Sequence, residues 1–330
     1  MTAAPSLHEI KAEERMIGAH QSIVRLRDDV RRAAPLSAPV LIHGPTGAGK
    51  ELVAQLLHKQ SGRHGRLVSI NVASLRLELV EAELFGVVRG AYTGAMNSRD
   101  GLIQQAAGGT LYLDEAADLP LAVQSALLRV IETGAVRPVG GAAERAVPFR
   151  LIVSVQQHPE HLAAAGRWRR DFLYRVAGIV LPVPPLRERR SDLRRLADHF
   201  LAAMERAPLE MPALQLLERH DWPGNVRELQ RVLERATFFS GSGPVHAGHV
   251  AAAINATVEN RSDDARPAYQ FEHRPTLADL QRSYVEQVLR EARFDVRATA
   301  RVLGLSTATL YRRLKSMGVE LRAAKTDSRK

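Results

Sequence analysis

The chain has 330 residues, a length that suggests two or three domains. Of these residues 45% are hydrophobic and 25% are charged, and the net charge is +10. It contains no cysteine, which excludes disulfides, thiolate metal sites and thiol catalysis. No apolar run approaches the ~20 residues that span a bilayer, and residues 1–15 lack the apolar core of a signal peptide. We therefore expect a cytoplasmic protein with no membrane partner.

The first half of the chain predicts a parallel α/β sheet. Residues 40–43 form a short β-branched, apolar run typical of a buried strand, and residues 51–60 carry apolar side chains on one helical face. Further strands are expected at 67–72, 110–113 and 151–155, with a helix between the last two. Strands that alternate with helices favour a parallel sheet.

A proline-rich break at residues 182–185 ends this pattern, and the chain beyond it reads as helical. Ser191 is expected to cap the first of these helices, and a later helix begins near Asn225. The predicted domains are a short tail (1–15), an α/β domain (16–185), a helical lid (186–254), a polar linker (255–275) and a second helical domain (276–330).

A glycine-rich loop lies between the first predicted strand and helix. It consists of Gly44, Pro45, Thr46, Gly47, Ala48, Gly49 and Lys50. Its backbone N–H groups can wrap phosphates, and its lysine supplies a charge to the β- and γ-phosphates, so the motif predicts ATP binding. Glu51 stands where Ser or Thr usually reaches magnesium; it either acts through water or only favours the helix N-terminus.

A pair of carboxylates, Asp114 and Glu115, follows the predicted strand 110–113. Beside a phosphate loop this pair is typical of a nucleotide hydrolase. Asp114 is expected to hold Mg²⁺, and Glu115 to polarise the attacking water. Without that loop, the same pair would suit an ordinary acidic turn.

The basic end of the chain predicts DNA binding. Residues 290–330 contain eleven Lys or Arg against four Asp or Glu, a net charge of +7. This charge alone suits a nucleic-acid-binding segment and a solvated basic tail equally well. A helix, a Gly304 turn, a Ser306 cap and a second helix suggest a helix-turn-helix. The candidate base contacts are Thr307, Thr309 and Arg312; Arg313 and Lys315 are candidate phosphate contacts, and Tyr311 lies on the same exposed surface.

Two further segments narrow the prediction, namely residues 83–86 and the run Gly90, Ala91, Tyr92, Thr93, Gly94 and Ala95. The second run resembles the signature loop of sigma-54-dependent transcription activators, which are AAA+ ATPases. The resemblance covers residues 16–254, and a Fis-like terminus follows. It implies an AAA+ sheet sandwich with a helical lid, an all-α Fis-type domain, and contact of the 90–95 loop with sigma-54.

The same resemblance implies roles for single residues. Asn71 matches the switch asparagine that restrains the catalytic glutamate, and Gln156 stands where the first sensor is normally Asn. Arg169 and Arg175 match the arginine fingers, Arg227 matches the second sensor on the lid, and residues 132–141 match a supporting loop.

The resemblance also implies partners and a mechanism. A homo-oligomer, from dimer to hexameric ring, binds upstream double-stranded DNA and hydrolyses ATP to remodel the closed complex of sigma-54 RNA polymerase. The chain departs from the family at Val87 and Val88, which replace a His-Glu pair, at Gln156, and at Tyr92, which replaces Phe. The alternatives are a DNA-binding repressor that no longer contacts sigma-54, and an AAA+ helicase or protein remodeller.

Residues 276–291 carry apolar side chains at helical spacing. They suit either a dimerisation helix or a helix that packs within one subunit. Because only about fifteen residues precede Met16, we expect control by a regulatory protein acting in trans or by expression level.

Overall fold

The structure, a computed structural model, describes residues 16–91, 97–264, 282, 284–286, 288–289, 292 and 294–316. The chain divides into two compact units, Met1–Thr257 and Val258–Lys330, and each is described by itself. Within the described residues, no helix is long and apolar enough to cross a membrane.

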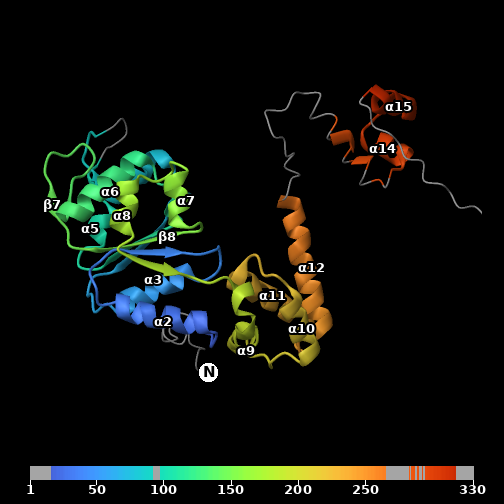
Figure 1. Ribbon diagram of the computed structural model, residues 1–330, viewed down its shortest axis with the longest axis horizontal. Helices are drawn as coiled ribbons and strands as arrows, with labels where there is room; N and C mark the ends of the chain where they lie inside the picture. Colours follow the sequence, from blue (N-terminus) through green and yellow to red (C-terminus); the bar gives the residue numbers. More distant parts are fainter. Residues whose placement is uncertain are drawn as a thin grey trace, which may run out of the picture. The chain divides into compact units, whose positions relative to one another are not determined.

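A five-stranded parallel sheet forms the centre of the first unit (Figure 1). Its order is β2-β5-β8-β1-β9. The strands are β1 (Val40–His43), β2 (Leu67–Asn71), β5 (Thr110–Asp114), β8 (Arg150–Val155) and β9 (Ile179–Pro182). The predicted parallel α/β sheet is confirmed, and β9 is a strand that the sequence did not reveal.

Helices cover both faces of this sheet (Figure 1). Two of them, α2 (Gln21–Ala33) and α3 (Lys50–Lys59), pack on one face. The other face carries α4 (Val80–Phe85), α5 (Leu102–Gln105), α6 (Leu121–Thr133), α7 (Pro159–Ala164) and α8 (Arg170–Val176). Strand side chains alternate between the two cores: Leu111 and Leu113 enter one, and Tyr112 enters the other.

A buried arginine joins the sheet to the end of α2. The side chain of Arg150, at the start of β8, is 1% exposed. It donates hydrogen bonds to the carbonyls of Ala33, Ala34 and Ala38, at 2.8, 2.7 and 3.2 Å. Burial lowers the pKa of Arg150 to about 10. The bonds to Ala33 and Ala34 satisfy carbonyl groups at the C-terminus of α2, which otherwise lack partners.

Four helices and a 3₁₀ segment form the lid. They are η4 (Leu186–Asp192), α9 (Leu193–Ala203), α10 (Met211–Arg219), α11 (Asn225–Ser240) and α12 (Ala247–Asp264), around a separate apolar core. Because α12 continues to Asp264, residues 255–264 are helical rather than part of the expected linker; residues 265–275 lie outside the described residues. The prediction that Ser191 caps a helix is wrong, since Ser191 lies inside η4 and Asp192 takes the cap position of α9.

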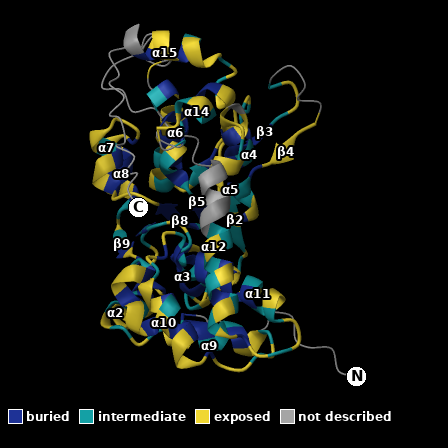
Figure 2. Cartoon of the chain, turned by 90° about the vertical axis from the view of Figure 1, so that its right-hand side faces the viewer, coloured by how far each residue is buried: buried dark blue, intermediate teal, exposed yellow. Residues whose placement is uncertain are grey.

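Short elements connect these layers. They are the 3₁₀ segments η1 (Val72–Ser74), η2 (Leu77–Leu79) and η3 (Ala116–Asp118), and the strands β3 (Gly86–Val87), β4 (Arg99–Asp100), β6 (Ala135–Val136) and β7 (Arg145–Ala146). Strands β3 and β4 form a separate antiparallel pair (Figure 2), in which both residues of β3 are buried and both residues of β4 are exposed.

The described part of the second unit is a small helical domain. Its helices α14 (Val296–Val302) and α15 (Thr307–Ser316) share a core with Val285 and Leu289. The described residues of the predicted 276–291 helix therefore pack at least partly within one chain. Tyr284 in this segment is 48% exposed, so a second role in dimerisation stays a prediction.

Candidate nucleotide-binding site

The phosphate loop connects β1 to the N-terminus of α3, as the sequence predicted. Two of its glycines have left-handed backbone angles, with φ of 73° at Gly47 and 111° at Gly49. A Cβ atom at Gly47 would lie 2.3 Å from the carbonyl oxygen of Gly224. Only glycine fits this position, because the lid backbone approaches the loop so closely.

Lys50 lies buried at the N-terminus of α3. Its side chain is 6% exposed, and its Nζ donates to the carbonyl of Gly44 at 3.0 Å and lies 3.4 Å from Oε1 of Glu115. The amine of Lys50 thus lies close to the N-terminus of α3, the end of a helix where phosphates bind most readily.

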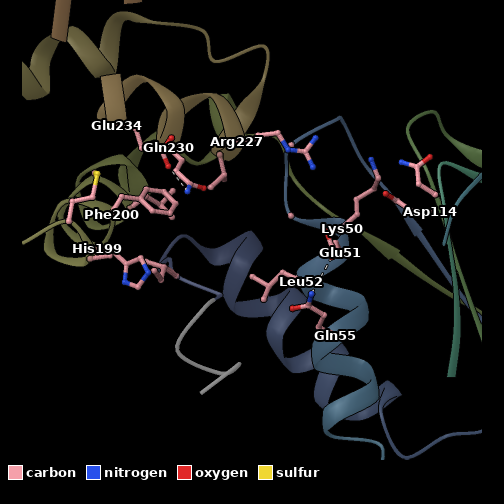
Figure 3. Close-up of a pocket in the computed structure, with 18 of the residues that line it drawn as sticks. Lys50, Glu51, Leu52, Gln55, Asp114, His199, Phe200, Arg227, Gln230 and Glu234 are labelled. Carbon is pink, nitrogen blue, oxygen red and sulfur yellow. Dashed lines mark hydrogen bonds between the residues drawn. The ribbon is translucent and has the colours of Figure 1, made fainter. Parts of the chain in front are cut away.

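One cavity of about 570 Å³ lies where the loop, the sheet and the lid meet (Figure 3). Eight of the predicted site residues line it: Gly47, Gly49, Lys50, Glu51, Asn71, Asp114, Glu115 and Arg227. The lid adds apolar and polar side chains that the sequence did not single out, among them His199, Phe200, Gln230 and Glu234. Burial lowers the pKa of His199, which favours its neutral form in the cavity wall.

The polar side chains Asn71, Asp114 and Glu115 reach the cavity from the ends of two neighbouring strands. Asn71 ends β2 and pairs in register with Asp114, which ends β5. Ligands of open α/β sheets bind at these carboxyl ends. The hydroxyl of Tyr112 donates to Oδ1 of Asp114 at 2.7 Å, and burial, with the carboxylate of Asp114, raises the pKa of Tyr112. Glu115 has a left-handed backbone with φ of 54°, a strained conformation that clusters at functional sites.

Gln156 follows the last residue of β8 and is exposed. It is absent from the lining of the cavity. The side chain that the family pattern assigns to the first sensor is thus not brought to the carboxylates in this chain, and its contact with a γ-phosphate stays a prediction.

Asn225, at the start of α11, is a residue whose contacts the sequence did not reveal. Its Nδ2 donates to the carbonyl of Thr46 at 2.9 Å, and its Oδ1 accepts the N–H of Leu186 at 2.8 Å. Its φ is 53°, an angle that Asn tolerates better than most residues. The Gly-Asn pair after Pro223 was the available signal for such a turn.

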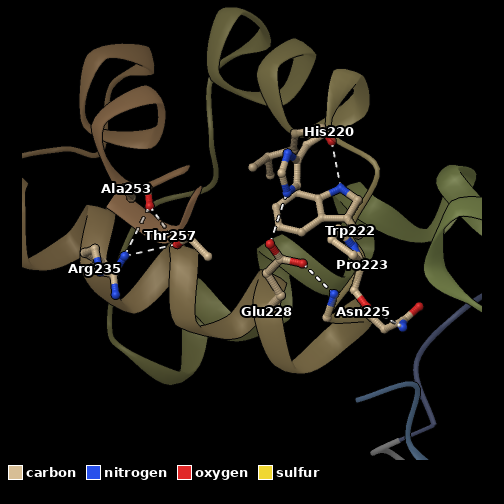
Figure 4. Close-up of polar contacts among 10 residues, drawn as sticks. His220, Trp222, Pro223, Asn225, Glu228, Arg235, Ala253 and Thr257 are labelled. Atoms are coloured by element: carbon tan, nitrogen blue, oxygen red, sulfur yellow. Dashed lines mark hydrogen bonds and ion pairs between the residues drawn. The ribbon is translucent and has the colours of Figure 1, made fainter. Parts of the chain in front are cut away.

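The turn before α11 is held by buried polar groups (Figure 4). Glu228, 5% exposed, accepts the N–H of Gly224 at 2.7 Å and lies 3.1 Å from Nε2 of His220. Trp222, 1% exposed, donates its indole N–H to the carbonyl of Leu217. This turn places Arg227 on the cavity wall, where its backbone N–H donates to the carbonyl of Gly47 at 3.3 Å.

Arg189, in η4, makes a second contact between lid and loop. It is 4% exposed, and its Nη2 donates to the carbonyl of Ala48 at 3.2 Å. Burial lowers its pKa. Asp192, three residues on, accepts the N–H groups of Ala19 and His20 at 2.7 and 3.0 Å. The junction of sheet and lid therefore holds both the phosphate loop and the segment before α2.

The two predicted finger arginines lie elsewhere on the first unit. Arg169, before α8, is bound by Asp171 at 3.0 and 2.7 Å, a pairing that raises the pKa of Arg169. Arg175 donates to the carbonyl of Ile131 at 3.2 Å. Neither belongs to the residues that line the cavity.

The base of the signature loop packs against the predicted supporting loop. The N–H of Val88 donates to the carbonyl of Val139 at 3.1 Å, and the N–H of Val139 to that of Gly86 at 2.9 Å. Gly140 lies so close that a Cβ there would be 2.6 Å from Cβ of Ala91. Gly90 is exposed, and Tyr92, Thr93, Gly94 and Ala95 lie outside the described residues.

The second unit has the geometry of a helix-turn-helix. The turn at Gly304 has φ of 64°, and Oγ of Ser306 accepts the N–H of Thr309 at 3.2 Å, so Ser306 caps α15 as predicted. Leu310 and Leu314 face the core. The exposed residues of α15 include the predicted contacts Thr307, Tyr311, Arg312 and Arg313. Thr309 is half-buried and bonded to Ser306, and the side chain of Lys315 lies outside the described residues.

Comparisons with protein families match each part of the chain. Residues 16–182 match the sigma-54 interaction domain, 187–267 the AAA+ ATPase lid domain, and 276–317 the bacterial regulatory proteins of the Fis family. The lid match agrees with the helical structure of residues 255–264.

Individual proteins agree with these families. The chain is 38% identical to the response regulator protein PilR of Pseudomonas aeruginosa over 96% of its own length and 72% of that protein. It is 37% identical to the transcriptional regulatory protein ZraR of Salmonella typhimurium, over 91% of the chain and 68% of the relative. A structure of NtrX from Brucella abortus in complex with ADP matches with a TM-score of 0.66 and 32% identity, covering 92% and 69% of the two chains.

The cavity at the phosphate loop, the paired carboxylates, the helix-turn-helix and these matches agree on one assignment. The chain belongs to the sigma-54-dependent transcription activators, which combine an AAA+ ATPase with a Fis-type DNA-binding domain.

Proposed function

We propose that the chain assembles into a ring, most simply a hexamer, hydrolyses magnesium-ATP between neighbouring subunits, and uses the motion of the 90–95 loop to remodel sigma-54 RNA polymerase at a closed promoter. The helix-turn-helix holds the ring at upstream double-stranded DNA, which places this work in the cytoplasm. The cavity that joins Lys50, Asp114, Glu115 and Arg227 is the observation that carries the proposal.

The residues of the cavity fit a magnesium-nucleotide complex. Lys50 and the N-terminus of α3 offer positive charge to phosphates. Asp114 offers carboxylate oxygen, the ligand type that Mg²⁺ prefers. Bound magnesium would neutralise charge that develops on the β- and γ-phosphates. Glu115 would orient the attacking water and accept its proton, while Arg227 holds the phosphates from the lid.

The finger arginines support hydrolysis between subunits. Transition-state charge on the γ-phosphate calls for a cation beyond Lys50. Arg227 lines the cavity, but neither Arg169 nor Arg175 does, so a finger arginine in this site would come from a neighbouring subunit. Their exposed position suits this role, because each can reach outward without breaking a buried contact.

Mixed rings test this arrangement directly. Lys50→Ala removes phosphate binding but keeps the finger, and Arg175→Ala keeps the cavity but removes a finger. Each variant alone should lose ATPase activity, while their mixture should regain a measurable fraction. Arg170→Ala, on the same exposed stretch, is the matched control and should hydrolyse ATP normally. Mixtures that stay inactive at every ratio would argue for a finger acting within one chain.

Contact with sigma-54 is tested at the loop tip. Thr93→Ala should abolish open-complex formation on a sigma-54 promoter while ATP hydrolysis continues. The physical reason is that threonine offers one hydrogen-bonding group and one methyl group to the proposed contact of the 90–95 loop with sigma-54. Full activation by this variant would refute the proposed role of the loop.

DNA binding is proposed for the exposed surface of α15. Thr307, Arg312 and Arg313 project from its exposed side, and a recognition helix presents such residues to the major groove. Lys315, Tyr311 and Thr309 complete the proposed contact set, with Ser306 as the cap. Arg313→Ala should weaken binding to all sequences alike and lower the salt dependence of the binding constant, as expected for a phosphate contact.

A further inference from the structure

Two hydroxyl groups lie beside the proposed magnesium ligand. Side chains alternate along a strand, so residues 112 and 114 of β5 share one face of the sheet. On the neighbouring strand β8, Ile152 pairs in register with Tyr112. Ser154, two residues further along β8, therefore lies beside Asp114. Tyr112 and Ile152 both belong to the core under α3, which places all these side chains on the phosphate-loop side.

Both hydroxyls bond to the same oxygen of the same carboxylate. Tyr112 and Ser154 each donate to Oδ1 of Asp114. Both donors are buried, with 1% of Tyr112 and 0% of Ser154 exposed. Among the described residues, none donates a hydrogen bond to Oδ2 of Asp114. One oxygen is thus held by the protein, and the other can face the cavity that Asp114 lines.

Ser154 also holds the second carboxylate. Its Oγ accepts the backbone N–H of Glu115 at 3.2 Å. Glu115 is the residue with the left-handed φ of 54°, which no β-strand continuation would favour. The bond from Ser154 fixes this turn of the backbone. In this conformation Oε1 of Glu115 lies 3.4 Å from Nζ of Lys50.

We propose that Tyr112 and Ser154 are positioning residues for the two carboxylates of the ATPase site. Their hydroxyls hold Oδ1 of Asp114, which leaves Oδ2 as the oxygen that would be offered to magnesium, and Ser154 alone also bonds to the backbone of Glu115. This inference rests on the proposed magnesium-ATP chemistry. It predicts that the two hydroxyls share one role and that Ser154 has a further one.

Magnesium titration separates these roles. Binding of a fluorescent, non-hydrolysable ATP analogue to the full chain would be measured at increasing Mg²⁺ concentrations. Tyr112→Phe and Ser154→Ala should each raise the Mg²⁺ midpoint about 10-fold, the effect typical of losing a group that orients a metal ligand. Affinity for the analogue without Mg²⁺ should stay unchanged. At saturating Mg²⁺, kcat should recover in Tyr112→Phe but stay about 10-fold low in Ser154→Ala.

A matched control exists on the same face of β5. Thr110 is also buried, and its hydroxyl bonds to Nδ1 of His58 at 2.9 Å, away from the carboxylates. Thr110→Val should leave the Mg²⁺ midpoint unchanged. Thermal unfolding without nucleotide verifies that every variant is folded, and the subtle Tyr112→Phe change serves if Ser154→Ala is unstable.

The outcomes distinguish the inference from the function on which it rests. If Mg²⁺ does not affect analogue binding in the unmodified chain, the proposed magnesium chemistry fails. If Mg²⁺ acts normally and neither variant shifts the midpoint, the positioning role is overturned. Equal loss of kcat in both variants at saturating Mg²⁺ would remove the separate role of Ser154.

Discussion

The side-chain amide of Asn225, on the lid, donates to the backbone carbonyl of Thr46 in the phosphate loop at 2.9 Å. The same side chain accepts the N–H of Leu186, where the lid begins. One residue therefore joins the nucleotide loop, the start of the lid and the helix that carries Arg227. A change in the loop on nucleotide binding would reach the lid through this contact.

Asn225→Gly should weaken ATP binding about 10-fold. Glycine accepts the φ of 53° without strain but loses the bonds to Thr46 and Leu186, and a net loss of about 1–1.5 kcal/mol corresponds to roughly that factor in Kd. Binding of a fluorescent ATP analogue measures it. Arg235→Ala is the control, because Arg235 bonds to Ala253 and Thr257 inside the lid (Figure 4). Equal affinity in both variants would contradict the role of Asn225.

The site could be predicted from the sequence where its residues are neighbours along the chain. The phosphate loop follows an apolar strand and precedes an amphipathic helix, and Asp114 and Glu115 follow another apolar strand. In a parallel sheet, such strand ends meet at one edge. Local order alone thus predicted the phosphate-loop and carboxylate residues of the cavity, and the structure places those residues together.

Contacts between distant parts of the chain could not be predicted in this way. Asn225 and Thr46 are separated by 179 positions, and Arg150 and Ala33 by 117. No spacing rule pairs such residues. Ser154 lies within an apolar run that reads only as a strand, and its hydroxyl gains a role because β8 lies between β1 and β5. Gln156, by contrast, was assigned by family pattern, and its exposure is a property of this fold.

Arg150→Met should lower the free energy of unfolding by about 3 kcal/mol at neutral pH. The substitution leaves three carbonyls without their donors, and each bond to a charged group contributes about 1.5–3 kcal/mol, part of which is offset by removing a buried charge. Urea unfolding of the full chain measures this change. Arg145→Met, at an exposed arginine, should stay within about 0.5 kcal/mol of the unmodified chain. Similar free energies of unfolding for the two variants would show that the bonds from Arg150 to the three carbonyls do not stabilise the fold.

Glu115→Gln should separate ATP binding from hydrolysis. The amide keeps the size of the side chain and loses its capacity to accept a proton, so turnover should fall about 10²–10⁴-fold. Because Lys50 keeps its bond to Gly44, ATP affinity should change by only a few-fold. Phosphate release and analogue binding are the two measurements. Turnover within 10-fold of the unmodified chain would require another base.

Stability should fall as pH decreases below neutrality, in part because of His58. Burial lowers the pKa of His58, with Arg63 adding to the shift. The unfolded chain therefore binds a proton at His58 more readily than the folded chain does. The contribution of neutral His58 to the free energy of unfolding is complete above pH 6.5, and it is lost as pH falls from 6.5 through the pKa of the folded state. His58→Gln should flatten the difference between urea unfolding at pH 7.5 and 5.5. Part of this difference between the two pH values should remain, since burial also lowers the pKa of His43 and His199. If His58→Gln shows the same pH dependence of the free energy of unfolding as the unmodified chain, groups other than His58 cause that dependence.

Gly140→Ala should uncouple ATP hydrolysis from promoter opening. Gly140 has φ of 73°, and its missing Cβ would lie 2.6 Å from Cβ of Ala91, so alanine has to push the base of the 90–95 loop away. Since Gly140 does not line the cavity, ATPase activity should stay within about twofold, whereas open-complex formation on a sigma-54 promoter should fall about 10-fold or more, because misplacement by ~1 Å has effects of that size.

Gly62→Ala is the matched control for that change. Its φ of 70° imposes the same backbone strain, about 1–2 kcal/mol, but nothing lies within 4 Å of the added Cβ. If the contact with Ala91 transmits the motion, Gly62→Ala should lower thermal stability and leave promoter opening intact. Loss of opening in both variants would attribute the effect to stability, and normal opening in Gly140→Ala would show that the supporting loop does not position the 90–95 loop.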